Sequence, residues 1–138
     1  MSTYQSKNFE VINLPKIHDI RGNLSFFENN NHIPFIIKRT YWIYDVPGGE
    51  SRGGHAFKNQ QQFILSLSGS FDVNLYDGNA DFKITLNRSY IGILINPLTW
   101  LQLDNFSTNS LALIVNSQYY NESDYIRSKE EFNKIITK

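Results

Sequence analysis

A single histidine stands in the segment of the chain whose residue types are best suited to chemistry. His55 follows Arg52 and two glycines, and Phe57 lies two residues further on. An imidazole titrates near neutral pH and can act as a general base, and glycine lets the backbone approach a ligand closely. Because Arg52 adds positive charge beside the imidazole, the segment indicates a site for an anionic substrate. The alternative is that His55 and Phe57 fill space in a core.

The spacing of this segment resembles the first motif of the cupins, with most of the metal ligands replaced. Phe57 stands where that motif has a second histidine, and Gln62 stands where it has an acid. The second cupin motif would supply a histidine just beyond Trp100, where this chain has Leu101. A stable transition-metal site needs three or four protein ligands. We therefore expect no metal and no other cofactor, and a metal-dependent dioxygenase is the weakest alternative.

A second group of polar side chains lies on one face of a predicted strand at residues 35–44. Side chains alternate between the two faces of a strand, so Arg39 and Tyr41 share a face with two isoleucines. A buried guanidinium is costly without a partner, and Arg39 could bind a phosphate or carboxylate through paired hydrogen bonds. The alternative is that Arg39 lies at a barrel rim and pairs with an internal acid. Trp100 offers a platform for a ring of the substrate, with core packing as the alternative.

Short β-prone runs separated by turn signals must position these residues. The runs lie at residues 35–44, 62–67, 70–76, 82–86, 90–95, 98–103 and 111–116. This spacing is typical of an antiparallel sandwich or barrel. The one convincing helix is residues 123–136, where Ser123 can cap the first turn and no Gly or Pro interrupts. We expect Tyr125, Phe132 and Ile136 on its buried face.

Composition excludes several classes of function. The 138 residues, 41% of them hydrophobic, fit one globular domain with a single core. The 13 basic and 13 acidic residues balance, so nothing favours nucleic acid or a membrane surface as a partner. No apolar run is long enough to span a membrane, and the first residues do not resemble a signal peptide. With no cysteine to form disulfides, we expect a cytoplasmic protein.

Several blocks of the sequence together resemble the dTDP-sugar 3,4-ketoisomerases, which are small WxcM-like cupins. The blocks are residues 39–44, 52–56, 67–70, 86–87, 96–100 and 119–127, and the likeness extends from about residue 16 to residue 132. The resemblance implies an all-β cupin, a jelly-roll antiparallel barrel with a short C-terminal helix, as one domain over residues 1–138. It also implies a metal-free dimer.

The N-terminal region, residues 1–15, is where we expect that homodimer to form. The run at residues 9–14 is β-prone and precedes the barrel. An open edge strand tends to pair with another chain, so strand exchange or edge pairing would join two copies.

The resemblance implies a reaction as well. These enzymes move a keto group from C4 to C3 of dTDP-4-keto-6-deoxyglucose through an enediol, for sugars of bacterial surface glycans such as lipopolysaccharide O-antigen. By this likeness His55 is the catalytic base, Tyr41 a catalytic pocket tyrosine, and Arg39 and Arg52 bind the diphosphate. Arg21 lies where product stereochemistry differs within the family. The other substrate-binding candidates are Phe57, Gln62 and Trp100.

Two further readings stay open because the chain departs from the family pattern. Phe57 replaces the usual second histidine, and Leu101 replaces an arginine or histidine. The chain could therefore be an epimerase or isomerase of a related nucleotide ketosugar that needs one base. It could also be a non-catalytic module that binds nucleotide sugars.

Overall fold

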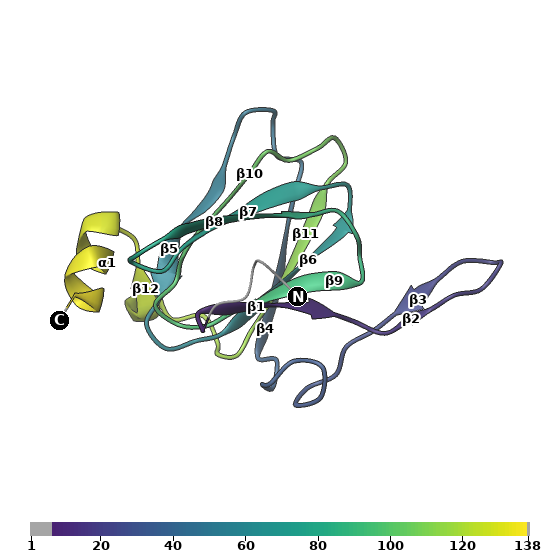
Figure 1. The fold of residues 1–138 in the computed structure, drawn as a ribbon, viewed down its shortest axis with the longest axis horizontal. Helices are drawn as coiled ribbons and strands as arrows, with labels where there is room; N and C mark the ends of the chain where they lie inside the picture. Colours follow the sequence, from purple (N-terminus) through teal and green to yellow (C-terminus); the bar gives the residue numbers. More distant parts are fainter. Residues whose placement is uncertain (1–6, 138) are drawn as a thin grey trace.

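Two five-stranded antiparallel sheets make up most of the structure, a computed structural model that describes residues 7–137 (Figure 1). The first sheet contains, in spatial order, β1 (Phe9–Asn13), β9 (Ile91–Ile95), β6 (Gln62–Ser68), β11 (Leu111–Asn116) and β4 (Arg39–Tyr44). The second contains β12 (Tyr125–Ile126), β5 (Arg52–Phe57), β10 (Trp100–Asp104), β7 (Phe71–Tyr76) and β8 (Asp81–Leu86). This architecture confirms the expected all-β jelly-roll class.

The main hydrophobic core lies between the inner faces of the two sheets. Strand alternation turns Phe71, Val73 and Leu75 of β7 toward Ile64 of β6 and Ile114 of β11, and all five are almost fully buried. Burying a side chain of this size contributes about 1.5–3 kcal/mol relative to leaving it exposed. These contacts hold the two sheets together and fix which side chains face inward.

The first sheet is also covered on part of its outer face. Phe63 and Leu65 of β6 and Val115 of β11 pack there against Ile33 and Phe35 from the segment that precedes β4. Burial on both faces explains why β11 has a continuously apolar sequence instead of an alternating one.

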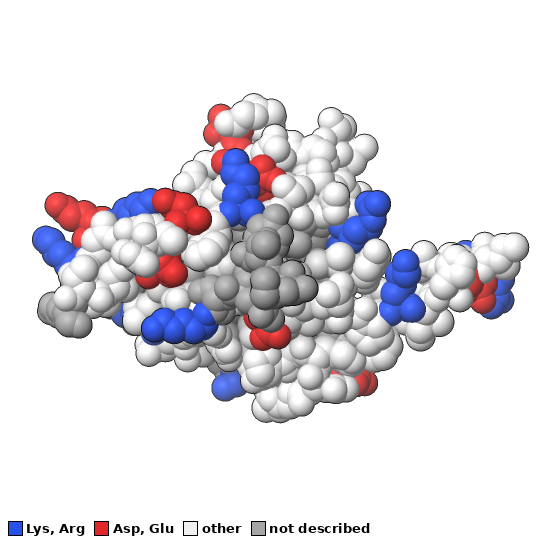
Figure 2. Space-filling view, viewed as in Figure 1, with Lys and Arg blue, Asp and Glu red and all other residues white. Residues whose placement is uncertain are grey.

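A two-stranded hairpin projects away from both sheets, at the right of Figure 1. It consists of β2 (Lys16–Ile17) and β3 (Leu24–Ser25), which pair only with each other. Its side chains include Ile20, which is 99% exposed. In Figure 2 the hairpin is uncharged between its base and its tip, whereas charges of both signs are interspersed over the rest of the visible face.

The C-terminal helix is shorter than the predicted span of residues 123–136, and this prediction was wrong at its start. Helix α1 is Lys129–Ile136, preceded by a 3₁₀ helix, η1 (Glu122–Asp124), and by β12. Tyr125 and Ile126 pair with Phe57 and Ala56 of β5, so their backbone groups belong to a β-ladder and not to a helix. Ser128, not Ser123, caps α1, because its side chain accepts a hydrogen bond from Glu131 N.

The run at residues 9–14 lies within the chain's own first sheet. Strand β1 pairs with β9 and occupies the end of that sheet, which leaves its other edge unpaired within the described residues. The first six residues of the predicted dimerisation region lie outside the described residues. Within residues 7–137, no helix is long and apolar enough to cross a membrane.

Candidate active site

A pocket of about 360 Å³ opens on the inner side of the sheets and is completed by the segment that leads into β12. Its apolar walls come from β4, β5, β10 and β11. Seven of its lining residues carry charged, aromatic or titratable side chains: Arg39, Tyr41, Arg52, His55, Tyr120, Tyr125 and Arg127.

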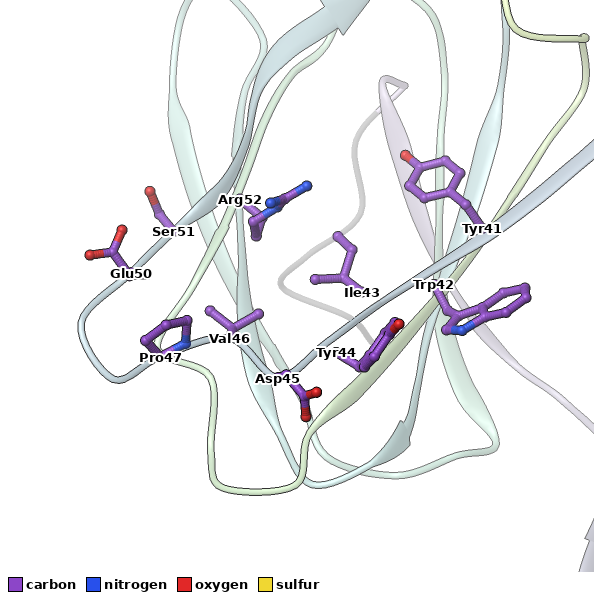
Figure 3. A pocket seen from close by; sticks show the side chains of 10 residues that line it. All are labelled: Tyr41, Trp42, Ile43, Tyr44, Asp45, Val46, Pro47, Glu50, Ser51 and Arg52. Atoms are coloured by element: carbon purple, nitrogen blue, oxygen red, sulfur yellow. The ribbon is translucent and has the colours of Figure 1, made fainter.

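Strand β4 supplies two of these residues by simple alternation. Arg39 and Tyr41 are partly buried on the inner face, whereas Trp42 and Tyr44 are exposed on the other face. Figure 3 shows Tyr41 on the same side of β4 as Arg52, with Trp42 and Tyr44 on the opposite side. The predicted shared face of Arg39 and Tyr41 is therefore confirmed. A second pocket of about 570 Å³, drawn in Figure 3, adjoins the first and shares Tyr41 and Arg52 with it.

Strand β5 places His55 deep in the pocket. The imidazole is 8% exposed, and Nε2 has no hydrogen-bond partner among the described residues. Gly53 and Gly54 both have positive φ, at 95° and 80°. A Cβ on Gly53 would lie 3.1 Å from the carbonyl oxygen of Leu101, so this close approach to β10 requires glycine. The two glycines also explain why the sequence does not predict a strand at β5, because glycine is rare in strands.

Three rings pack together around the histidine. Centroid distances are 4.8 Å from His55 to Phe57, 5.2 Å from His55 to Tyr125, and 4.6 Å from Phe57 to Tyr125. Burial, together with the charges of Arg127 and Arg39, lowers the pKa of His55 from 6.5 to about 4. His55 is therefore a neutral imidazole at physiological pH, free to accept a proton.

Arg39 lies among three tyrosines. Its guanidinium carbon is 4.8 Å from the ring centroid of Tyr41 and 5.3 Å from that of Tyr120. Its Nη2 donates a hydrogen bond to the Tyr125 hydroxyl at 3.0 Å. Burial first, and then the neighbouring Tyr125, raises the pKa of Tyr41 to about 12, despite the opposing effect of Arg39. Tyr41 thus remains a protonated phenol, able to donate a hydrogen bond to an oxygen that gains negative charge.

A surface ion pair supports the outer wall of the pocket. Arg127 donates two hydrogen bonds to Glu122, at 2.7 and 2.8 Å, and the Tyr120 hydroxyl donates another to Glu122 at 2.6 Å. These hydrogen bonds, from Arg127 first and then from Tyr120, lower the pKa of Glu122 to about 2. Arg127 also lies over the Tyr125 ring, 4.1 Å from its centroid. Exposed ion pairs add little stability, so the effect of this one is to orient the side chains.

Four of the predicted site residues line the pocket together: Arg39, Tyr41, Arg52 and His55. Phe57 is buried in the ring cluster behind His55, which is the space-filling role given as the alternative. Gln62 is buried on the inner face of β6, directly across from Asn116, and its Oε1 has no partner among the described residues.

Like Phe57 and Gln62, Trp100 and Arg21 are not among the residues that line this pocket. The Trp100 ring packs against Phe132 of α1, 5.8 Å between centroids, so the structure supports its packing role and not that of a substrate platform. Its neighbour Leu101 takes the inward direction, because adjacent strand residues face opposite ways. Arg21 lies at the tip of the projecting hairpin and forms an ion pair with Asp19 at 2.9 Å.

Sequence reasoning missed three lining residues, Tyr120, Tyr125 and Arg127. All three fall in the block of residues 119–127, whose aromatic and basic composition was a signal for a ligand site. Tyr125 was instead placed on a helix.

Among the described residues, no three His, Cys, Asp or Glu side chains gather closely enough to hold a metal ion. The rings that pack against His55 belong to Phe57 and Tyr125.

Comparisons with known proteins show which family the chain belongs to. Residues 7–137 match the family model described as WxcM-like, C-terminal (FdtA). The TDP-4-oxo-6-deoxy-alpha-D-glucose-3,4-oxoisomerase of Aneurinibacillus thermoaerophilus is 43% identical over 129 residues, which are 94% of this chain and 93% of that protein.

Two solved structures are similar over nearly their full length. The TDP-quinovose 3,4-ketoisomerase WlaRB from Campylobacter jejuni has a TM-score of 0.89 and 42% identity, covering 94% of this chain and 99% of that one. The sugar 3,4-ketoisomerase QdtA from Thermoanaerobacterium thermosaccharolyticum, in complex with TDP, has a TM-score of 0.93 and 32% identity, covering 96% of this chain and 97% of that one.

Proposed function

The chain belongs to the WxcM-like family, and from this premise we propose that it is a dTDP-sugar 3,4-ketoisomerase acting on a 4-keto-6-deoxyhexose. The observation that carries the proposal is a neutral, buried imidazole, His55, in a pocket that also holds arginines and tyrosines. The family match over residues 7–137 supports the prediction of one cupin domain across residues 1–138. The product would supply the synthesis of a surface-glycan sugar.

The residues divide between binding and chemistry. A proton on carbon next to a carbonyl becomes acidic enough to remove when a base is in reach and the new negative charge is stabilised. His55 removes the proton from C3 of the sugar, and Tyr41 donates a hydrogen bond to the oxygen on which charge develops. Arg52, at the rim shared by the two pockets, binds the diphosphate, with Arg39 adding positive charge from within.

We propose that this reaction proceeds without a metal, because Phe57 stands beside His55 where the cupin motif has its second histidine, which leaves a single imidazole. Phe57 packs against His55 and contributes to the shape of the site. The cytoplasmic location expected from the sequence stays a prediction.

Proton exchange tests the function directly. We expect the protein to convert dTDP-4-keto-6-deoxyglucose to the 3-keto isomer in D₂O, with deuterium entering the sugar at C3 or C4 and with activity persisting in the presence of EDTA. His55→Asn should lower turnover about 10²-fold or more, the usual effect of losing a general base, with dTDP affinity nearly unchanged.

The matched control is His32→Asn, since His32 lies outside the pocket, in edge-to-face contact with Phe26. A wild-type protein that binds dTDP and exchanges no sugar proton would instead be a binding module. Exchange without a 3-keto product would indicate an epimerase.

We further propose a homodimer joined through the projecting hairpin of residues 16–25. The hairpin exposes the apolar side chains of Ile17, Ile20 and Leu24, and burying them against a second copy would be energetically favourable. Strand β4 is unpaired along one edge within the described part of the chain, and Trp42 and Tyr44 are exposed on its outer face. A hairpin that reaches across a second copy also gives Arg21 a route to the other copy's pocket, where it could contact substrate.

A further inference from the structure

A ketoisomerisation moves two protons, and the pocket contains one imidazole. The proton on C3 must reach C4, and the proton on the C3 hydroxyl must reach the oxygen on C4. His55 can serve the carbons, because a base on one face of the sugar can take the proton from C3 and return it to C4. The two oxygens need a second proton carrier.

The other titratable side chains that line the pocket are three tyrosines, and their surroundings distinguish them. The Tyr120 hydroxyl already donates a hydrogen bond to Glu122, at 2.6 Å on the exposed surface. Tyr41 is buried, and burial opposes formation of a phenolate, so Tyr41 holds its proton.

Tyr125 has the geometry that a proton carrier needs. Its oxygen accepts a hydrogen bond from Arg39 at 3.0 Å, so the proton of its own hydroxyl is directed elsewhere. The donor at this oxygen is the positively charged guanidinium of Arg39. Tyr125 and His55 line the same pocket, with their ring centroids 5.2 Å apart, so one sugar in the pocket can contact both. The charged and titratable groups that face Tyr125 are Arg39 of β4, His55 of β5, Tyr41, Tyr120 and Arg127.

We propose that Tyr125 is a catalytic residue that carries the proton between the two sugar oxygens, an inference that rests on the proposed ketoisomerase function. As His55 takes the C3 proton, the C3–H electrons form the C3–C4 double bond and the C4 carbonyl electrons move to its oxygen. Tyr125 gives its proton to that oxygen and becomes a phenolate beside Arg39. The phenolate then takes the proton of the C3 hydroxyl, the C3 carbonyl forms, and the double bond takes up the proton from His55 at C4. Both side chains return to their starting state.

The decisive variant is Tyr125→Phe, which keeps the ring packing against His55 and Phe57 and removes the hydroxyl. We expect kcat to fall about 10²-fold or more, as for loss of a general acid–base group, while dTDP affinity and the unfolding midpoint stay close to those of the wild type. The matched control is Tyr119→Phe, because Tyr119 is exposed and lies outside this pocket, and it should leave kcat within about threefold.

A second measurement separates proton transfer from a purely structural role. A fluorinated tyrosine with a lower phenol pKa, incorporated at position 125 alone, should move the alkaline limb of the kcat profile to lower pH. At position 119 it should not.

Each outcome decides one claim. If the wild type and Tyr119→Phe convert the substrate and Tyr125→Phe does so equally well, this inference fails while the proposed function stands. An equal loss of dTDP affinity and kcat would make Tyr125 a binding residue and also overturn it. If the wild type itself shows no conversion and no exchange, the proposed function fails instead.

Discussion

At the scale of single residues, the environment of His55 sets the chemistry. The imidazole is enclosed by the rings of Phe57 and Tyr125 and lies near two guanidinium groups. Each of these features disfavours the charged imidazolium, because the rings exclude water and the arginines repel a second positive charge. The base is therefore weak, and it remains in its neutral, proton-accepting form over a wide range of pH.

The pH profile of kcat/KM should show this weakness. Because the pKa of His55 is lowered from 6.5 to about 4, the neutral form persists as pH falls below 6.5, and activity should decline only near pH 4. Initial rates at low substrate concentration check this. The lowered pKa of His55 also means that the unfolded state binds more protons than the folded state between pH 6.5 and 4. The free energy of unfolding therefore falls as the pH falls through this range, so circular dichroism must show at each pH that the protein is still folded. An acid limb centred near 6.5 would contradict the burial argument.

Some site residues were predictable from the sequence because their positions follow from alternation or from a spaced motif. Arg39 and Tyr41 share a face since they are two residues apart in a strand. His55 follows from the glycine and arginine that surround it. Trp100 was misplaced because alternation does not tell which face is inside, and the helix that covers its face is distant in sequence.

At the scale of elements, a buried carboxylate fixes the short segment that carries Tyr125. Asp124 is 2% exposed, and its Oδ1 accepts hydrogen bonds from the backbone N and the Nδ2 of Asn59, both at 2.9 Å. Its Oδ2 accepts a third from Gln60 Nε2 at 3.0 Å. The turn before β12 is thereby attached to the turn after β5, so the position of Tyr125 depends on Asp124.

Asp124→Asn should destabilise the fold by about 1.5–3 kcal/mol, because the new amide places a donor against donors and removes the charge-assisted bonds. Urea unfolding measures this free energy. Asp81→Asn is the matched control, since Asp81 is exposed on β8, and it should change stability by less than about 0.5 kcal/mol. If the two variants are equally stable, Asp124 does not anchor the segment.

The start of α1 shows what local sequence can and cannot reveal. Ser128 and Glu131 have the spacing of a capping box, and this pattern would have placed the helix start correctly. The strand pairing of Tyr125 with Phe57 has no local signature, because it depends on a residue 68 positions away. The residues after Ser123 therefore form a strand that pairs with β5, although the local sequence favours a helix there.

At the scale of the whole molecule, the projecting hairpin is distinctive because it exposes the apolar side chains of Ile17, Ile20 and Leu24. Its apolar side chains lie apart from the three hydrophobic clusters of residues 7–137. The sequence predicts the dimer contact within residues 1–15, where β1 pairs with β9 on one edge and leaves its other edge unpaired within the described residues. The hairpin that follows it is the better candidate.

Analytical ultracentrifugation at micromolar concentration should therefore give the mass of a dimer. Replacing Ile17 and Leu24 by Asp should shift the sedimenting species toward the monomer, because charged side chains cannot be buried in an apolar contact without a large penalty. Tyr119→Asp introduces a charge at another exposed aromatic position and should leave the mass unchanged. A monomeric wild type would contradict the proposed assembly.

The strands β5 and β10 carry two sets of residues that natural selection and protein engineering can vary separately. Their inward positions, His55 and Leu101, shape the pocket, while Ala56 and Trp100 on the opposite face hold α1 in place. Substitutions at the inward positions of these strands should alter substrate preference. Substitutions at the alternate, outward positions should alter folding. A combinatorial library confined to the inward positions could therefore select for new sugar substrates while the fold is kept. Phe57 and Leu101, where the chain departs from the pattern of the family that it resembles, both lie on this inward face.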